Sequence, residues 1–360
     1  MKLKLPLPFW TIFAPVLAWL FYFLLSNNAE GIYIALLAFA LIATVMAAVY
    51  HAEVVAHRIG EPYGTLLLAV AVTVIEVSLI VSLMLAGGPD AAALARDTVF
   101  AAIMIILTGI IGLCLLLGGV RYKEQVFGRH GVSAALVTLT AISVLTLVLP
   151  NYTTSIPGPV YNQSQLIFVA IVSLVLYGTF VMVQAVRHRD YFLPPDADGN
   201  KEVHAPRPTI KTTGFSFILL LVCLGAVVLL AKTLSPAIEK GVVDLGAPKS
   251  LVGIIVALVI LLPEGLAALR AARKNRLQTS LNLALGSALA SIGLTIPAVA
   301  IVSIFTGLTI TLGIDTKATM LLILSLFTNM LSFGTGRTNI LQGVVLLVIF
   351  AVYLFTTIVP

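Results

Sequence analysis

The chain has 360 residues, of which 60% are hydrophobic and 10% are charged. Since soluble domains carry roughly 25% charged residues, this composition excludes a protein with a large water-facing surface. The net charge of +6 at pH 7 would suit a nucleic-acid partner only if the basic residues formed one surface, and they instead follow the loops between apolar runs. The composition therefore predicts a membrane protein in contact with the lipid bilayer, without a nucleic-acid partner.

Apolar runs of about 20 residues repeat along the whole chain, and each is long enough to cross a bilayer as a helix. We expect an all-α polytopic fold with about 11 transmembrane helices and no strands, since barrel strands are ~10-residue alternating segments. The first helix, within residues 1–30, is expected to remain in the mature protein because no clear cleavage site follows it. The predicted spans are 8–25, 31–56, 64–86, 98–120, 131–150, 165–186, 214–235, 250–270, 280–306, 317–334 and 339–359.

The placement of lysine and arginine predicts the orientation. With a cytoplasmic N-terminus, sixteen basic residues lie on the inner side and four on the outer side, which is the bias expected of cytoplasmic loops. The inner residues are Lys2, Lys4, Arg58, Arg121, Lys123, Arg129, Arg187, Arg189, Lys201, Arg207, Lys211, Arg270, Arg273, Lys274, Arg276 and Arg337. The outer residues are Arg96, Lys240, Lys249 and Lys317, and Lys232 lies inside a span.

Residues 187–213 form the longest stretch without an apolar run, and four prolines and many charges predict a flexible cytoplasmic linker. The linker separates a five-helix segment, 31–186, from a second one, 214–360. Because each segment has an odd number of spans, the second inserts upside down relative to the first. Inverted repeats are typical of secondary transporters, whose substrate site lies near the midplane between the repeats.

Glu76 and Glu264 lie inside predicted spans, at matching places in the two segments. A charge at the centre of a spanning helix costs ~2.5–3.5 kcal/mol, so such carboxylates are rare. Burial favours the protonated acid and a bound cation favours the carboxylate, so two such acids can hold either protons or a cation. The alternative is that each is a protonated acid with an interhelical hydrogen bond. The pairing favours a site for a cation and protons.

A hard cation such as Ca²⁺ needs about six to eight oxygen ligands, so two glutamates are too few. Pro263 has no N–H, which leaves the carbonyl group of Val259 available as a ligand. Hydroxyl groups can add oxygens, although many membrane serines and threonines bond only to their own helix. The candidate hydroxyls are those of Thr73, Ser78, Ser287 and Ser291.

Glu53 and Lys232 occupy equivalent positions in the two segments and carry opposite charges. One hypothesis is that they pair, or engage the site acids in turn, and so gate access to the site. The alternative is that each side chain extends to its own membrane interface.

Enzyme functions are disfavoured. His51 and His57 flank Glu53 but are six residues apart, whereas a zinc H-E-x-x-H motif needs histidines four apart on one helix face. The chain has no glycine-rich phosphate loop, so no nucleotide or other cofactor is expected. A cation channel stays possible because acidic rings also select cations.

Four stretches of the chain resemble the cation/proton exchanger branch of the Ca²⁺:cation antiporter superfamily. They lie in the order expected of that family and spread over most of the chain: residues 57–77, 118–127, 261–297 and 334–343, the last reading GTGRTNILQG. The resemblance implies ten core helices in two inverted halves, and one cation-binding glutamate from each half, here Glu76 and Glu264. It implies export of cytoplasmic cations in exchange for protons, across the inner (plasma) membrane.

Departures from the family pattern argue against a site that binds Ca²⁺ alone. Thr73 and Leu261 stand where the family has asparagine three residues before each glutamate, and Ala290 stands at a glutamine position. Lys232 replaces a usual acid. Ca²⁺, Na⁺ and K⁺ are therefore all candidate substrates, and an antiporter of monovalent ions alone is the alternative.

Overall fold

The computed structural model describes residues 7–25, 31–60, 63–193, 208–244, 246, 248 and 250–359. The chain divides into two compact units, each built from two separate stretches. The first unit is Met1–Ala91 with His204–Val252, and the second is Ala92–Val203 with Gly253–Pro360. Each unit therefore combines helices from before and after the predicted linker.

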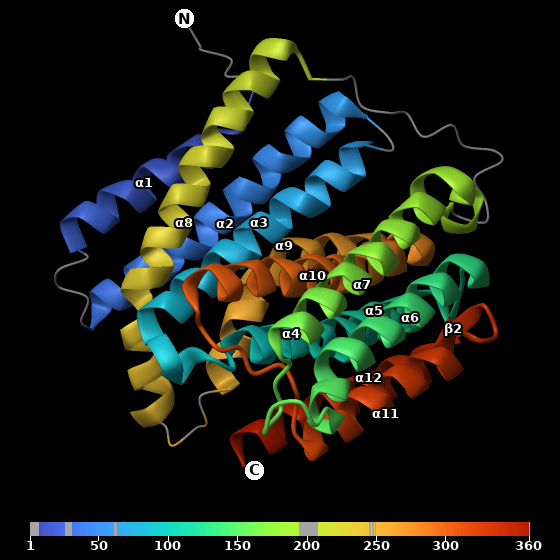
Figure 1. Ribbon diagram of the computed structural model, residues 1–360. Coiled ribbons are helices and arrows are strands. Elements are labelled where there is room, and N and C mark those ends of the chain that lie inside the picture. Colours follow the sequence, from blue (N-terminus) through green and yellow to red (C-terminus); the bar gives the residue numbers. More distant parts are fainter. Residues whose placement is uncertain are drawn as a thin grey trace, which may run out of the picture. The chain divides into compact units, whose positions relative to one another are not determined.

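The first unit is built around α2, which packs against α1, α3 and α8 (Figure 1). Its helices are α1 (Phe9–Leu25), α2 (Ile32–Ile59), α3 (Tyr63–Gly87) and α8 (Ile210–Asp244), and the 3₁₀ turn η2 (Gly88–Ala91) follows α3. The indole N–H of Trp19 donates to the carbonyl of Val222 at 3.2 Å, which joins α1 to α8. The Nε2 atom of His51 lies 3.1 Å from the carbonyl oxygen of Thr11, which joins α2 to α1. Apolar packing and these two polar contacts thus tie the N-terminal helix to the unit.

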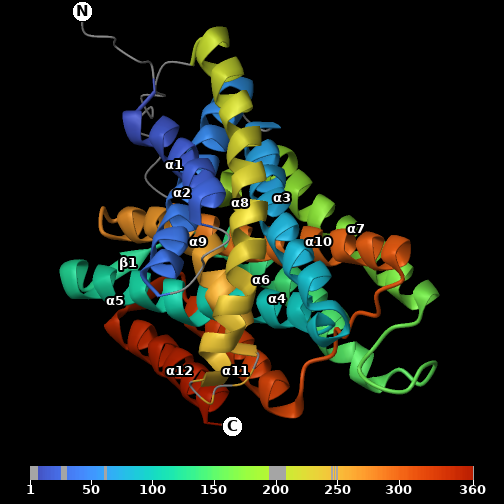
Figure 2. The same cartoon turned by 90° about the vertical axis from the view of Figure 1, so that its left-hand side faces the viewer.

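The second unit contains the remaining helices, arranged around a continuous helical run from residue 94 to 122 (Figure 2). Every residue from 98 to 112 in this run is buried, as expected of an apolar segment surrounded by other helices. The run consists of α4 (Leu94–Met104), the π-helical segment η3 (Ile105–Ile110) and α5 (Ile111–Tyr122). The other elements are β1 (Glu124–Val126), α6 (Arg129–Ser143), η4 (Val144–Val148), η5 (Leu149–Tyr152), α7 (Gln163–Met182), η6 (Val183–Arg187), η7 (Arg189–Phe192), α9 (Ser250–Ala272, within this unit from Gly253), α10 (Leu277–Thr306), α11 (Thr316–Phe333), β2 (Arg337–Asn339) and α12 (Ile340–Ile358).

Helices α5 and α12 approach closely because glycines face each other at their crossing. A Cβ atom on Gly343 would lie 2.5 Å from the backbone nitrogen of Leu116 and 3.0 Å from the carbonyl oxygen of Gly112. Small residues of this kind allow helix backbones in membranes to pack without a side chain between them. The glycines therefore set the distance between α5 and α12.

The connecting segments of the second unit gather at two ends. At the predicted inner end, the Tyr122 hydroxyl donates to the carbonyl of Arg273 at 3.0 Å, and the Gln125 amide donates to Asn275 at 3.0 Å. At the predicted outer end, Arg96 donates to the carbonyl of Gly313 at 3.0 Å. The side-chain amide of Asn151 donates to the carbonyl of Ile314 at 2.6 Å. Segments expected on one side thus bond to each other, which agrees with the predicted alternation of the spans in this unit.

The prediction of an all-α polytopic membrane protein is confirmed. Among the described residues, ten helices are long and apolar enough to cross a membrane, and the shorter apolar helix Phe9–Leu24 precedes them. Helices extend past the apolar runs because polar residues continue them at the ends, and α8 has 35 residues where a span at 214–235 was expected.

The expectation that the chain has no strands is wrong. β1 and β2 form a two-stranded antiparallel sheet in which Glu124 pairs with Asn339 and Val126 with Arg337. Each strand is three residues long and directly follows the end of a helical segment or its turn. The pairing depends on α5 and α12 lying side by side, which a reading of apolar runs does not reveal.

Most of the predicted linker, residues 194–207, lies outside the described residues. Its first part is ordered around Tyr191, whose ring stacks on those of His188 and His130 with centroids 4.8 and 4.9 Å apart. The division into two inverted five-helix segments stays a prediction, since the two compact units are a different division of the chain.

Candidate functional site

Glu76 is the only charged residue of α3, and it is only 1% exposed. The adjacent residue Ile75 and the residues one turn later, Leu79 and Ile80, are also buried. A carboxyl group in such surroundings changes its charge only when a proton or a cation compensates it, because isolated charges are costly away from water. The burial of Glu76 is consistent with a role in holding a proton or a cation, and that role stays a prediction.

The hydroxyl groups near Glu76 differ in what they bond. The Thr73 hydroxyl donates to the carbonyl of Ala69, one turn earlier on the same helix, at 2.9 Å. Ser78 is half-buried, and its carbonyl accepts a hydrogen bond from the Ser82 hydroxyl at 2.6 Å. For Thr73, the structure therefore matches the alternative in which a membrane threonine bonds its own helix backbone.

Glu53 and Lys232 are both exposed, on α2 and α8, two helices that pack against each other in the first unit. Their exposure is consistent with the alternative in which each side chain extends to its own membrane interface. The packing of α2 against α8 is consistent with the hypothesis that the two side chains pair and gate the site. Their role in gating stays a prediction.

Glu264 is the only acidic residue of α9 and is half-buried. It directly follows Pro263, which lies inside the helix and cannot donate a backbone hydrogen bond to the carbonyl of Val259. Val259 is also half-buried. Its carbonyl oxygen thus has the capacity for a cation or water that the sequence predicts.

Two glycines of α9 allow this helix to lie directly against the α4–η3–α5 run. A Cβ atom on Gly253 would lie 2.8 Å from the backbone of Asp97, and one on Gly265 would lie 3.1 Å from the side chain of Ile110. Gly265 is the residue after Glu264. The segment η3 therefore borders the part of α9 that carries the predicted cation-binding acid.

Ser287 and Ser291 lie on α10, four residues apart and so on one face of the helix. Ser291 is 4% exposed and Ser287 is half-buried. The first unit thus holds Glu53, Thr73, Glu76, Ser78 and Lys232, and the second holds Val259, Glu264, Ser287 and Ser291.

Two polar residues of the second unit escaped the sequence analysis. Asp97 lies in the first turn of α4, one residue before the predicted span, and accepts from Arg96 at 2.8 Å. Asn329 lies in the last third of α11, is fully buried, and donates to the carbonyl of Leu107 at 3.2 Å. An asparagine inside an apolar run was the available signal for Asn329.

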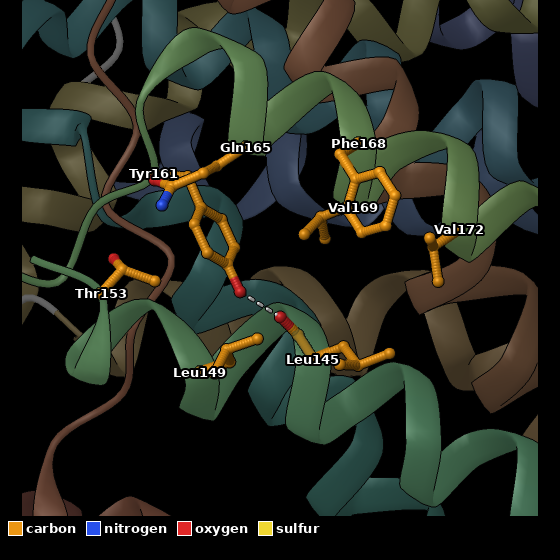
Figure 3. A pocket seen from close by; sticks show the side chains of 8 residues that line it. All are labelled: Leu145, Leu149, Thr153, Tyr161, Gln165, Phe168, Val169 and Val172. Atoms are coloured by element: carbon orange, nitrogen blue, oxygen red, sulfur yellow. Dashed lines mark hydrogen bonds between the residues drawn. The ribbon is translucent and has the colours of Figure 1, made fainter. Parts of the chain in front are cut away.

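A small cavity of about 140 Å³ lies beside η4, η5 and α7 in the second unit (Figure 3). It is lined by Leu145, Leu149, Thr153, Tyr161, Gln165, Phe168, Val169 and Val172. The Tyr161 hydroxyl donates to the carbonyl of Leu145 at 2.5 Å (Figure 3), and burial raises the pKa of Tyr161 to about 12. With a mostly apolar lining that includes no carboxylate, this cavity does not suit a dehydrated cation.

Comparison with known proteins decides the family. The model of the sodium/calcium exchanger protein family matches residues 30–186 and 215–359, which is most of the chain. The chain belongs to the sodium/calcium exchanger protein family.

Three proteins of known sequence are similar to most of this chain. The putative ionic transporter y4hA of Sinorhizobium fredii is 48% identical, over 88% of this chain and 86% of its own length. The sodium-potassium/proton antiporter ChaA of Escherichia coli is 36% identical, over 95% of this chain and 94% of its own length. The Ca²⁺/H⁺ antiporter of Aphanothece halophytica is 26% identical over 74% of this chain and 75% of its own length.

Solved structures of exchangers share the fold. The structure of native YfkE has a TM-score of 0.74 at 18% identity, covering 97% of this chain and all of that one. The H⁺/Ca²⁺ exchanger CAX has a TM-score of 0.71 at 15% identity, covering 96% of this chain and 88% of that one. At these identities the likeness shows a shared fold.

Proposed function

We propose that this protein is a secondary transporter that exchanges cytoplasmic cations for protons. The observation that carries the proposal is Glu76, a buried carboxyl group that is the only charge of an apolar spanning helix. Family membership supports it, and the relative from E. coli, which covers almost the whole chain, is named a sodium-potassium/proton antiporter. The proposal needs no cofactor and no catalytic residue.

Glu76 and Glu264 are proposed to hold either the transported cation or protons. A cation favours the charged carboxylates, whereas protons neutralise them, so the two ligands compete for the same oxygens. Competition of this kind couples an outward cation flux to an inward proton flux. The carbonyl of Val259 and the hydroxyls of Ser287 and Ser291 are proposed as further oxygens on the Glu264 side.

The two five-helix segments are proposed to be inverted repeats. In support, the family model matches two ranges, 30–186 and 215–359, that lie on either side of the predicted linker. In such transporters, the repeats move against each other and open the site to one side at a time.

The transported ions are proposed to be Ca²⁺, Na⁺ and K⁺, with monovalent ions alone as the second candidate. One departure in the sequence favours the second candidate: Thr73 and Leu261 stand where the family that the sequence resembles has asparagine, three residues before each glutamate. A site with fewer oxygen ligands suits an ion that needs fewer of them than Ca²⁺, which takes six to eight.

The N-terminus is proposed to face the cytoplasm, in the inner membrane of a bacterial cell. The excess of lysine and arginine in the predicted inner segments supports this orientation, and the relatives named above are bacterial.

The test is cation uptake into proteoliposomes driven by an imposed pH gradient, with Ca²⁺, Na⁺ and K⁺ assayed separately. Glu76→Gln and Glu264→Gln are expected to lower the rate roughly tenfold or more, because the amide cannot be charged or exchange a proton. Glu124→Gln is the matched control, since this acid is exposed and lies 3.9 Å from the exposed Arg337.

Uptake that persists in both glutamine variants would exclude the two acids as the binding groups. Flux of the parent protein that ignores the pH gradient would instead favour a cation channel.

A further inference from the structure

The second unit contains a π-helical segment in the middle of a spanning helix. Segment η3, residues Ile105–Ile110, lies between α4 and α5, and all six of its residues are buried. The other π-helical segments that the structure describes, η4 and η6, lie at the ends of α6 and α7. Mid-helix π segments are rare and often lie at functional sites, because a wider turn is less stable than the α-helix it interrupts. Contacts with other residues must therefore stabilise the π-helical form of η3.

Side-chain donors from two helices support the carbonyl groups of this segment. The hydroxyl of Thr108, within η3, donates to the carbonyl of Met104, the residue directly before η3. The amide Nδ2 of Asn329, from α11, donates to the carbonyl of Leu107 at 3.2 Å and to that of Ser325 at 2.8 Å. Asn329 is thus the long-range contact, since it lies 222 residues from Leu107 in sequence.

Asn329 is 0% exposed, so its hydrogen bonds form away from water. A buried amide that loses its acceptor keeps its desolvation cost, and a carbonyl that loses its donor does the same. The contact between Asn329 and Leu107 therefore favours the wide turn over a regular helix, in which the carbonyl of Leu107 would lie elsewhere.

The segment held by Asn329 packs against the helix that carries Glu264. Ile110, the last residue of η3, lies against Gly265, where a Cβ atom would be 3.1 Å from its side chain. On another side, the ring of Phe350 lies 3.4 Å from the position of a Cβ on Gly109. A change in η3 is therefore transmitted to α9 at the residue next to Glu264.

We propose that Asn329 is a positioning residue for transport, which keeps η3 in its π-helical form so that Ile110 seats against α9 beside Glu264. The inference rests on the proposed role of Glu264 in cation binding. Relaxation of η3 to an α-helix would turn the residues that follow by roughly 100°, the angle of one residue, and would move Ile110 off Gly265. The cation-binding surroundings of Glu264 would change although Asn329 does not touch the ion.

The test compares Asn329→Leu, Asn329→Asp and Ser325→Ala in the full-length protein, reconstituted in proteoliposomes. Asn329→Leu removes the donor at similar volume and is expected to raise the KM for the transported cation roughly tenfold while the maximal rate changes less. Ser325→Ala, one turn earlier on α11, is the matched control. Its hydroxyl donates to the carbonyl of Leu321 at 2.7 Å and also lies 3.5 Å from the sulfur of Met104, but the carbonyl of Leu107 keeps its donor in this variant. The KM of Ser325→Ala is therefore expected to change much less than that of Asn329→Leu.

Asn329→Asp keeps the shape and supplies a donor only when it is protonated. A carboxyl group buried away from water keeps its proton to a higher pH than an exposed one. The KM of Asn329→Asp, divided by the parental KM at the same pH, is therefore expected to be near one in acid and to rise towards the Asn329→Leu value as the pH increases.

A parental KM of Asn329→Leu at every pH would overturn the inference. A KM ratio of Asn329→Asp to parent that does not change with pH would also overturn it. If Asn329→Leu fails to fold, the pH dependence of Asn329→Asp alone tests the inference. Glu264→Gln separates this inference from the proposed function. If that variant transports normally, the role of Glu264 fails; if it is inactive while Asn329→Leu is parental, only the role of Asn329 fails.

Discussion

At the scale of single residues, the two spanning glutamates have different surroundings. Glu76 is almost completely buried in α3, whereas Glu264 is half-buried in α9 behind Pro263. Thr73, three residues before Glu76, supplies a hydroxyl where the family that the sequence resembles has the amide oxygen of asparagine, which is a ligand that Ca²⁺ commonly takes. The coordination of Glu76 is thus the place where one substitution is expected to change ion preference.

Thr73→Asn is expected to raise the preference for Ca²⁺ over Na⁺ and K⁺ by roughly three- to tenfold, because an amide oxygen adds a hard ligand three residues before Glu76. Asparagine at this position also matches the pattern of the family that the sequence resembles. Competition between Ca²⁺ and Na⁺ uptake in proteoliposomes measures the ratio. Thr73→Val, which only removes the hydroxyl, is the control and is expected to keep the parental ratio; an equal change in both variants would contradict the prediction.

At the scale of helices, close backbone approach determines the packing of the second unit. Gly343 of α12 faces the backbone of α5 at Leu116 and Gly112, with no room for a side chain. The same kind of approach places Gly265 of α9 against η3. These contacts join helices that are far apart in sequence.

Gly343→Ala is expected to destabilise the protein by about 1–3 kcal/mol, because the new methyl group would overlap backbone atoms that cannot move aside independently. Thermal unfolding in detergent, followed by loss of the monodisperse species, measures the effect as a lower midpoint. Gly178→Ala on α7 is the matched control. Nothing lies within 4 Å of its Cβ position, so the helix propensity of alanine is expected to leave stability unchanged or slightly higher.

At the scale of the whole molecule, the two compact units each combine both parts of the chain, and the connecting segments of the second unit meet at two ends. Arg121, Arg129, Arg273 and Arg337 are all exposed near the end where β1 and β2 pair. Such an excess of basic residues is typical of the cytoplasmic face. We therefore expect the end where β1 and β2 pair to face the cytoplasm.

Single cysteines test the orientation in a background without Cys114 and Cys223, both of which are buried. Thr335→Cys, in the exposed turn between α11 and β2, is expected to react with a membrane-impermeant maleimide only in inverted vesicles. Thr154→Cys, in the exposed segment before α7, is expected to react only from outside intact cells. Labelling of the two positions from the reverse sides would invert the proposed topology.

The spans and the two spanning glutamates were predictable from sequence, because hydropathy is a local property and a charge in an apolar run stands out without any knowledge of its neighbours. The sequence by itself thus determined that this is a polytopic membrane protein and that Glu76 and Glu264 lie within its spans. Only the tertiary structure decided three contacts: the β1–β2 pairing, the packing of Gly343 against the backbone of α5, and the hydrogen bond from Asn329 to Leu107 in η3. Each joins residues more than 200 positions apart, and a contact of that kind has no signal in the residues on either side of it.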